Sequence, residues 1–220
     1  MNEFICDVKV VTPPPTSGWV EMQLTKEASE RIKNYIKKSQ QSPQSLKGGL
    51  AGNISHSHSL KDEDDWFYNN VLSTCIETYV NTFNPLPEVR YFLQRNIGTH
   101  VDRNAFELKT LWVNYQKKYE FNPLHNHSGI FSFVLWNTIP YKFVDEISQE
   151  FLFGCSRPEP SSFKFTYPGM LGELESYHYC VEDDMRDKLV FFPSRLNHSV
   201  NPFYSSDEHR ISVSGNIDFK

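Results

Sequence analysis

Apolar residues recur every three or four positions in two stretches of the first part of the chain. The first is residues 26–38, KEASERIKNYIKK, preceded by Thr25, a residue type that often caps helix N-termini. One face of this stretch carries Ala28, Ile32, Tyr35 and Ile36. The second, residues 62–83, has a longer apolar stripe and an acidic start, which suits the positive end of a helix dipole. Both are predicted to be amphipathic helices that pack on a core.

From about residue 88 the pattern changes to short runs that are rich in β-branched and aromatic residues and are separated by turn residues. These runs are predicted strands, at residues 109–116, 129–137, 162–167, 188–193 and 209–219. A further short strand is predicted in the sequence ICDVKVV, which ends at three prolines, and a loop at residues 40–60.

Two helices followed by many spaced strands indicate a mainly β fold with helices. The expected architecture is an antiparallel sandwich or barrel with the helices on one face. A chain of 220 residues is expected to form one domain. Within it, residues 1–87 would make a helical layer and residues 88–220 a β core.

Composition narrows the function classes. The net charge is −5 and the sequence has no dense run of Lys and Arg, so it does not predict binding to nucleic acid or to an anionic membrane surface. No apolar run approaches 18 residues, and the N-terminus lacks the features of a signal peptide. Four scattered cysteines without a CxxC pattern favour reduced thiols over disulfides or a zinc ribbon, so a cytoplasmic protein is expected.

Two histidines stand one residue apart in NPLHNHSGIFSFVLW, residues 122–136, at the start of a predicted strand. If that strand extends back far enough, His125 and His127 face the same side and can bind one metal ion. The alternative is a polar turn before the strand. A third ligand is available in His198, which follows an apolar strand and a proline turn. Imidazoles suit iron, zinc, copper and nickel alike.

Arg210 and Ser212 lie two residues apart on the last predicted strand and therefore face the same side. A guanidinium fork beside a hydroxyl is suited to binding a carboxylate. The alternative for Arg210 is a surface salt bridge with Asp207 or Glu208.

The segments LWVNY, NPLHNH, LVFFPSRLNHSVNP and RISVSGNI together resemble the iron(II)/2-oxoglutarate-dependent oxygenases, over about residues 109–220. They are most similar to a bacterial and phage branch with the pattern NPxHxH…FPSxLxHxVxP…RxSxSxN. The resemblance implies a double-stranded β-helix, or jelly roll, in the cytosol of a bacterium or a phage-infected host. It also implies oxidative decarboxylation of 2-oxoglutarate coupled to hydroxylation of a small-molecule or peptide substrate.

The resemblance also assigns roles to residues. Iron(II) would be bound by His125, His127 and His198, and the distal carboxylate of 2-oxoglutarate by Arg210 and Ser212. Three further residues would contact the cosubstrate or line its pocket: Asn114, Tyr115 and Asn216. Segments 140–162 and 168–187 are expected to form the rim that selects the substrate.

One departure from the family pattern is important, since most members carry a carboxylate at the position of His127. Two other function classes therefore stay open. The first is a three-histidine, cupin-like dioxygenase that does not use 2-oxoglutarate, and the second is a jelly-roll binding or structural protein without activity. The chain has no GxSxG, GxGxxG or Walker motif, so a serine hydrolase or a nucleotide-binding protein is not supported.

Overall fold

The computed structural model describes residues 18–83 and 105–220. The strand predicted in ICDVKVV lies outside these ranges, as does Cys6. The other three cysteines are free thiols.

Both predicted helices are present. Helix α1 spans Lys26–Gln41, and its N-cap is Thr25, whose hydroxyl accepts the backbone N–H of Ala28 at 3.3 Å. The second helical region consists of a 3-10 turn, a π-helical turn and an α-helix, in the order η2 (Glu63–Asp65), η3 (Tyr68–Leu72) and α2 (Ser73–Phe83). Asp62 precedes this region, and its carboxylate accepts hydrogen bonds from the backbone N–H groups of Phe67 and Tyr68 at 2.8 Å each.

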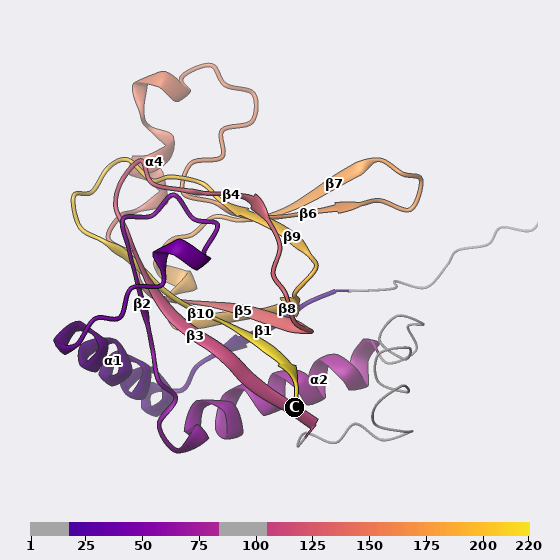
Figure 1. The fold of residues 1–220 in the computed structure, drawn as a ribbon. Coiled ribbons are helices and arrows are strands. Elements are labelled where there is room, and N and C mark those ends of the chain that lie inside the picture. Colours follow the sequence, from indigo (N-terminus) through magenta and orange to yellow (C-terminus); the bar gives the residue numbers. More distant parts are fainter. Residues whose placement is uncertain (1–17, 84–104) are drawn as a thin grey trace, which may run out of the picture.

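The strands form two antiparallel sheets that face each other (Figure 1). The larger sheet has the order β1-β8-β5-β10-β3-β2. Its strands are β1 (Val20–Gln23), β8 (Lys188–Pro193), β5 (Phe131–Thr138), β10 (Arg210–Phe219), β3 (Phe106–Gln116) and β2 (His56–Ser59). The smaller sheet has the order β4-β9-β6-β7. It consists of β4 (Asn122–His125), β9 (Asn197–Val200), β6 (Phe163–Pro168) and β7 (Leu174–Tyr179).

This arrangement confirms the predicted fold class, a mainly β jelly roll with helices on one face. Four short helical elements complete the described part: η1 (Lys47–Gly49), α4 (Phe143–Ile147), η5 (Glu150–Leu152) and η6 (Asp183–Met185). Helices α1 and α2 lie on the side of the larger sheet that faces away from the smaller one (Figure 1).

The N-terminal part of the chain is not purely helical, which corrects the prediction for residues 1–87. Strands β1 and β2 form the two edges of the larger sheet, and β2 lies inside the stretch 40–60 that was predicted to be loop. The sequence of β2, HSHS, carries no apolar signal. It is a strand because it pairs with β3 over its whole length, from His56 opposite Tyr115 to Ser59 opposite Trp112.

The two faces of β5 follow the alternation predicted from the sequence. Phe131, Phe133 and Leu135 belong to the core between the larger sheet and the helices. Val134 and Trp136 belong to a second core, which lies between the two sheets together with Phe163, Phe165 and Phe192. The helices therefore cover one face of the larger sheet, and the smaller sheet covers the other.

The interior face of the larger sheet is apolar on β5 and β8 but polar on β10 and β3. Because side chains alternate along a strand, Arg210, Ser212 and Ser214 of β10 point to the same side, and so do Asn114 and Gln116 of β3. The registers Arg210 opposite Gln116 and Ser212 opposite Asn114 bring the two polar rows side by side. The fold thus keeps a polar surface inside the barrel, next to the smaller sheet.

Replacing the fully buried Ile76 of α2 by alanine is expected to lower the free energy of unfolding by about 2–5 kcal/mol, because it leaves a cavity between helix and sheet. Urea denaturation of the purified variant measures this change. Ile147→Ala is the matched control, since Ile147 is 38% exposed and its loss should cost less than about 1 kcal/mol. Equal effects of the two substitutions would contradict the assigned core.

Candidate metal centre

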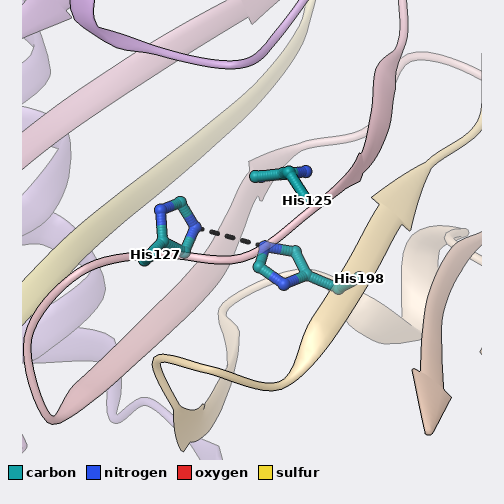
Figure 2. Close-up of side chains that lie close together, drawn as sticks. All are labelled: His125, His127 and His198. Atoms are coloured by element: carbon teal, nitrogen blue, oxygen red, sulfur yellow. Dashed lines mark hydrogen bonds between the residues drawn. The ribbon is translucent and has the colours of Figure 1, made fainter.

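Three histidines meet where the smaller sheet faces the polar rows of the larger one. His125 on β4 and His198 on β9 are direct cross-strand partners, and their ring centroids are 4.3 Å apart. His127 joins them from the loop after β4 (Figure 2). The ligating nitrogens of the three rings all lie within 4.8 Å of one another.

His127 does not lie on an extension of the strand, which corrects one premise of the sequence argument. Strand β4 ends at His125, and the chain then turns towards β5. The position of His127 is fixed instead by its backbone N–H, which donates to the carbonyl of Ser194 at 2.8 Å. Ser194 stands just before β9, so the two segments that carry the histidines are tied to each other.

The nitrogen geometry suits one ion. The Nε2 atoms of His127 and His198 are 3.2 Å apart (Figure 2). Two nitrogens each bound at about 2.1 Å to one metal, at a right angle, are about 3.0 Å apart. The cluster therefore needs only a small adjustment to place two ligands in adjacent coordination positions.

Backbone carbonyls set the tautomers of two of the rings. Nδ1 of His125 lies 2.7 Å from the carbonyl oxygen of Pro123, and Nδ1 of His198 lies 2.9 Å from that of Leu196. Because a carbonyl oxygen only accepts, each Nδ1 carries the proton. The lone pair is then on Nε2, which is the arrangement that metal-binding histidines require.

Burial keeps the three imidazoles neutral. It lowers the pKa of His125 below its ordinary value, that of His127 to about 4 and that of His198 to about 3. The proximity of His125 also lowers the pKa of the other two. Neutral rings can offer lone pairs to a cation near pH 7 without first losing a proton.

A narrow cavity lies against the cluster. The volume open to the centres of water molecules is about 40 Å³, which is room for about three waters. A row of polar groups from β2, β3 and β10 forms one wall: Ser57, Asn114, Ser212 and Ser214. The hydroxyl of Ser57 donates to Asn114 Oδ1 at 2.7 Å. Among the described residues, no Lys, Arg, Asp or Glu lines this cavity.

Part of the wall comes from the segment before β2, which sequence reasoning did not associate with the site. Leu50, Ala51 and Gly52 line the cavity, and the N–H of Asn53 donates to the carbonyl of Phe121 at 2.8 Å. A Cβ at Gly52 would lie 2.5 Å from the side-chain oxygen of Asn122, so a larger residue here would have to displace the Asn122 side chain. Three glycines between residues 48 and 52 were the only local signal.

The two segments expected to form the substrate rim, 140–162 and 168–187, contribute no residue to the wall of this cavity. Strand β6 pairs with β9 beside His198, and the far end of the β6–β7 hairpin projects beyond the two sheets (Figure 1). The segment that lines the cavity is instead residues 50–52, from the N-terminal part of the chain.

Comparison with known proteins agrees with this geometry. Residues 110–216 match a family described as "Putative 2OG-Fe(II) oxygenase", and this segment includes all three histidines. Over these residues, which are just under half of the chain, it is similar to the iron(II)/2-oxoglutarate-dependent oxygenases.

One solved structure shares the fold. A non-heme alpha ketoglutarate dependent carbocyclase from nogalamycin biosynthesis has a TM-score of 0.51 at 9% identity, with 91% of this chain and 79% of that chain covered. A prolyl-4-hydroxylase from Pseudomonas putida has a TM-score of 0.48 at 13% identity, with 93% and 94% covered. The search of curated proteins gives no match. None of the described helices is long and apolar enough to cross a membrane.

The structure places some of the residues that were expected to contact the cosubstrate at the cavity and others away from it. Asn114 and Ser212 face each other across β3 and β10 and line the cavity. Tyr115 does not, because it follows Asn114 on the strand and so points to the helix side, where it is 7% exposed. The prediction that Tyr115 contacts the cosubstrate is therefore corrected.

Asn216 is also absent from the cavity wall, and its side chain supports the His127 loop instead. Its Oδ1 accepts the Ser132 hydroxyl at 2.8 Å, so the proton in the 2.9 Å bond between Ser132 and Ser194 comes from Ser194. The backbone carbonyl of Ser194 accepts a hydrogen bond from the backbone N–H of His127. Asn216, Ser132 and Ser194 thus form a buried chain that ends at the backbone of a candidate ligand.

Arg210 lies inside the barrel, on the same face as Ser212, but it does not line the cavity. It is 2% exposed, and its five N–H groups all point to protein oxygens. Nε and Nη2 both donate to Gln116 Oε1, at 3.2 and 2.7 Å. Nη1 donates to the Tyr141 hydroxyl at 2.7 Å and to the Ser161 carbonyl at 2.9 Å. Nη2 also donates to the Asn201 carbonyl at 2.9 Å. The surface ion pair considered from the sequence is therefore not formed. Gln116 and Tyr141 had no sequence signal, whereas Ser194 is the serine of the pattern FPSxLxH.

Ser132→Ala removes both side-chain bonds of the buried chain and is expected to weaken metal binding about 10-fold, because the His127 loop loses its support. Titration with Co(II), followed by absorbance, measures the affinity and reports the ligand geometry. Ser132→Thr, which keeps the hydroxyl, should restore most of the affinity. Unchanged Co(II) affinity in the alanine variant would contradict a positioning role.

The low histidine pKa values predict the pH dependence of metal-free stability. The unfolded chain takes up protons on histidine below about pH 6.5, whereas folded His198 and His127 do so only near pH 3 and 4. The stability is therefore fully present above pH 6.5 and is lost as the pH falls towards those values. Urea denaturation in the presence of a chelator measures the free energy of unfolding between pH 7 and 5. As the pH falls, this free energy should decrease less for His198→Gln than for the wild type. An equal decrease in the two proteins would contradict the burial argument.

Proposed function

We propose that this chain is a non-haem iron(II)/2-oxoglutarate-dependent dioxygenase, with His125, His127 and His198 as the iron ligands. The observation that carries the proposal is the convergence of three neutral imidazoles within 4.8 Å, inside the segment that matches the oxygenase family. The donor set fits iron, because imidazole is a ligand type that iron accepts in proteins. Iron, 2-oxoglutarate and dioxygen together supply the oxidising chemistry.

Three neutral ligands leave the full dipositive charge of iron(II) uncompensated. A dianionic cosubstrate is then the natural partner, since its carboxylates neutralise the metal in a site where no acidic side chain of the described residues lines the wall. A carboxylate in place of His127 would cancel part of this attraction. The third histidine thus favours tight binding of 2-oxoglutarate, at a redox potential different from that of a site with a carboxylate ligand.

Arg210 is the proposed partner of the distal carboxylate. It is a buried cation whose hydrogen-bond acceptors are all neutral oxygens, and a buried charge without a counter-ion is costly. The hydroxyl of Tyr141, 2.7 Å from Nη1, offers a further donor or acceptor at the same place. Ser212 and Asn114 stand between Arg210 and the histidine cavity along the polar rows and are proposed to contact the body of the cosubstrate.

The remaining task of the protein is to orient the reactants and to exclude water. The apolar side chains of Phe163, Phe192, Leu50 and Ala51 also line the cavity. Because no charged side chain of the described part lines this space, the proposed substrate presents an uncharged group to the metal, as a small molecule or as part of a peptide.

The test is anaerobic calorimetry with Fe(II) followed by 2-oxoglutarate, together with measurement of succinate formation in air. The expected result is one metal per chain, cosubstrate binding that depends on the metal, and succinate formation. His198→Ala should weaken metal binding by more than about 100-fold, a larger loss than an outer hydrogen-bond partner causes. His178→Ala, which changes an exposed histidine on β7, is the matched control and should bind metal as the wild type does.

Two outcomes would contradict the proposal. Metal binding without 2-oxoglutarate binding or succinate would favour the three-histidine, cupin-like dioxygenase, a class that the HxH pattern keeps open. Binding of neither would favour a jelly-roll protein without activity.

A further inference from the structure

The guanidinium of Arg210 has one edge that is suited to a carboxylate, and a side chain of the protein occupies it. The N–H groups of Nε and Nη2 point in parallel, and a carboxylate can accept one hydrogen bond from each of them. These two groups are called the fork of Arg210. In this structure both atoms donate to one oxygen, Gln116 Oε1, at 3.2 and 2.7 Å. A neutral amide oxygen therefore stands where an anionic oxygen pair would bind.

The other partners of Arg210 differ in how easily they can move. The carbonyls of Ser161 and Asn201 belong to the backbone. Gln116 is a side chain with freely rotating bonds, held at its other end by one bond from Nε2 to the carbonyl of Glu120 at 2.5 Å. It lies directly opposite Arg210 in the register of β3 and β10 and is 4% exposed. Gln116 is thus the partner that an incoming carboxylate would displace.

The size of the cavity indicates that such a displacement is needed. The space beside the histidines holds only a few waters and reaches Ser212 but neither Gln116 nor Arg210. Ser212 is two residues from Arg210, about 7 Å along the strand. A ligand that bridges the metal and Arg210 must therefore open the space that Gln116 now fills.

We propose that Gln116 is an internal competitor for the distal carboxylate of the cosubstrate, and that it sets the cosubstrate affinity. In the free protein its carboxamide caps the fork of Arg210 and limits the cost of the buried charge. When 2-oxoglutarate binds, the carboxylate takes the fork and the carboxamide leaves it. This inference rests on the proposed function, since it assumes that 2-oxoglutarate is the ligand.

Gln116→Glu gives the sharpest test, because it has nearly the same shape but places a permanent carboxylate in the fork. Anaerobic calorimetry with Mn(II)-loaded protein should show 2-oxoglutarate binding weakened at least 10-fold, with the Mn(II) affinity unchanged. Gln116→Ala removes the competitor and should tighten 2-oxoglutarate binding several-fold. Gln23→Glu makes the same change on the exposed edge strand β1 and should alter neither affinity.

Thermal unfolding shows whether each variant is folded. Gln116→Glu gains a charge pair with Arg210 but loses the bond that Nε2 of Gln116 donates to the carbonyl of Glu120. If the wild type binds 2-oxoglutarate and both Gln116 variants bind it equally well, the inference is overturned and the proposed function stands. If the metal-loaded wild type does not bind 2-oxoglutarate, the proposed function fails and the inference fails with it.

Discussion

The pairing of β4 with β9 is the constraint on which the candidate site depends. It sets His125 directly opposite His198, so two ligands from distant parts of the chain share one position of a hydrogen-bonded ladder. The same ladder continues into β6, where Phe165 stands opposite His198 and supplies part of the burial that keeps the ring neutral. The geometry of the cluster is therefore a property of the small sheet, and only His127 needs a separate support.

The interior of the barrel combines two environments that are usually kept apart. On β5 and β8 it is an aromatic core, whereas on β10 and β3 it is a polar surface that includes a buried guanidinium. Such a surface is tolerable only when its hydrogen bonds are made, and Arg210, Ser132 and Asn114 all have partners. The polar rows are therefore stabilised by hydrogen bonds within the protein.

Much of the fold could be predicted from the sequence, since α1, β3, β5, β8 and β10 have a clear periodicity. Strand β2 could not, because a polar strand of four residues is stabilised by the ladder it joins and not by an apolar face. The three histidines were found through their spacing and the family pattern. Their arrangement depends on a turn that spacing does not reveal, and Tyr115 was misplaced because a single step along a strand reverses the face.

Gln116 and Tyr141 could not be identified from the sequence, for a different reason. Each becomes relevant only through its distance from Arg210, and neither has a residue type or a local motif that distinguishes it from other polar or aromatic residues. A sequence pattern identifies groups that act on a ligand, whereas groups that compete with a ligand are visible only in three dimensions.

The edge strands of the larger sheet have a consequence for the limits of the functional unit. Residues 110–216, which carry the family pattern, supply neither β1 nor β2 and neither of the helices α1 and α2. Cut out as a fragment, this segment would present two unpaired strand edges and a bare aromatic face, a combination that promotes aggregation. Strands β1 and β2 and helices α1 and α2 therefore cover the two edges and one face of the sheet that the matched segment forms.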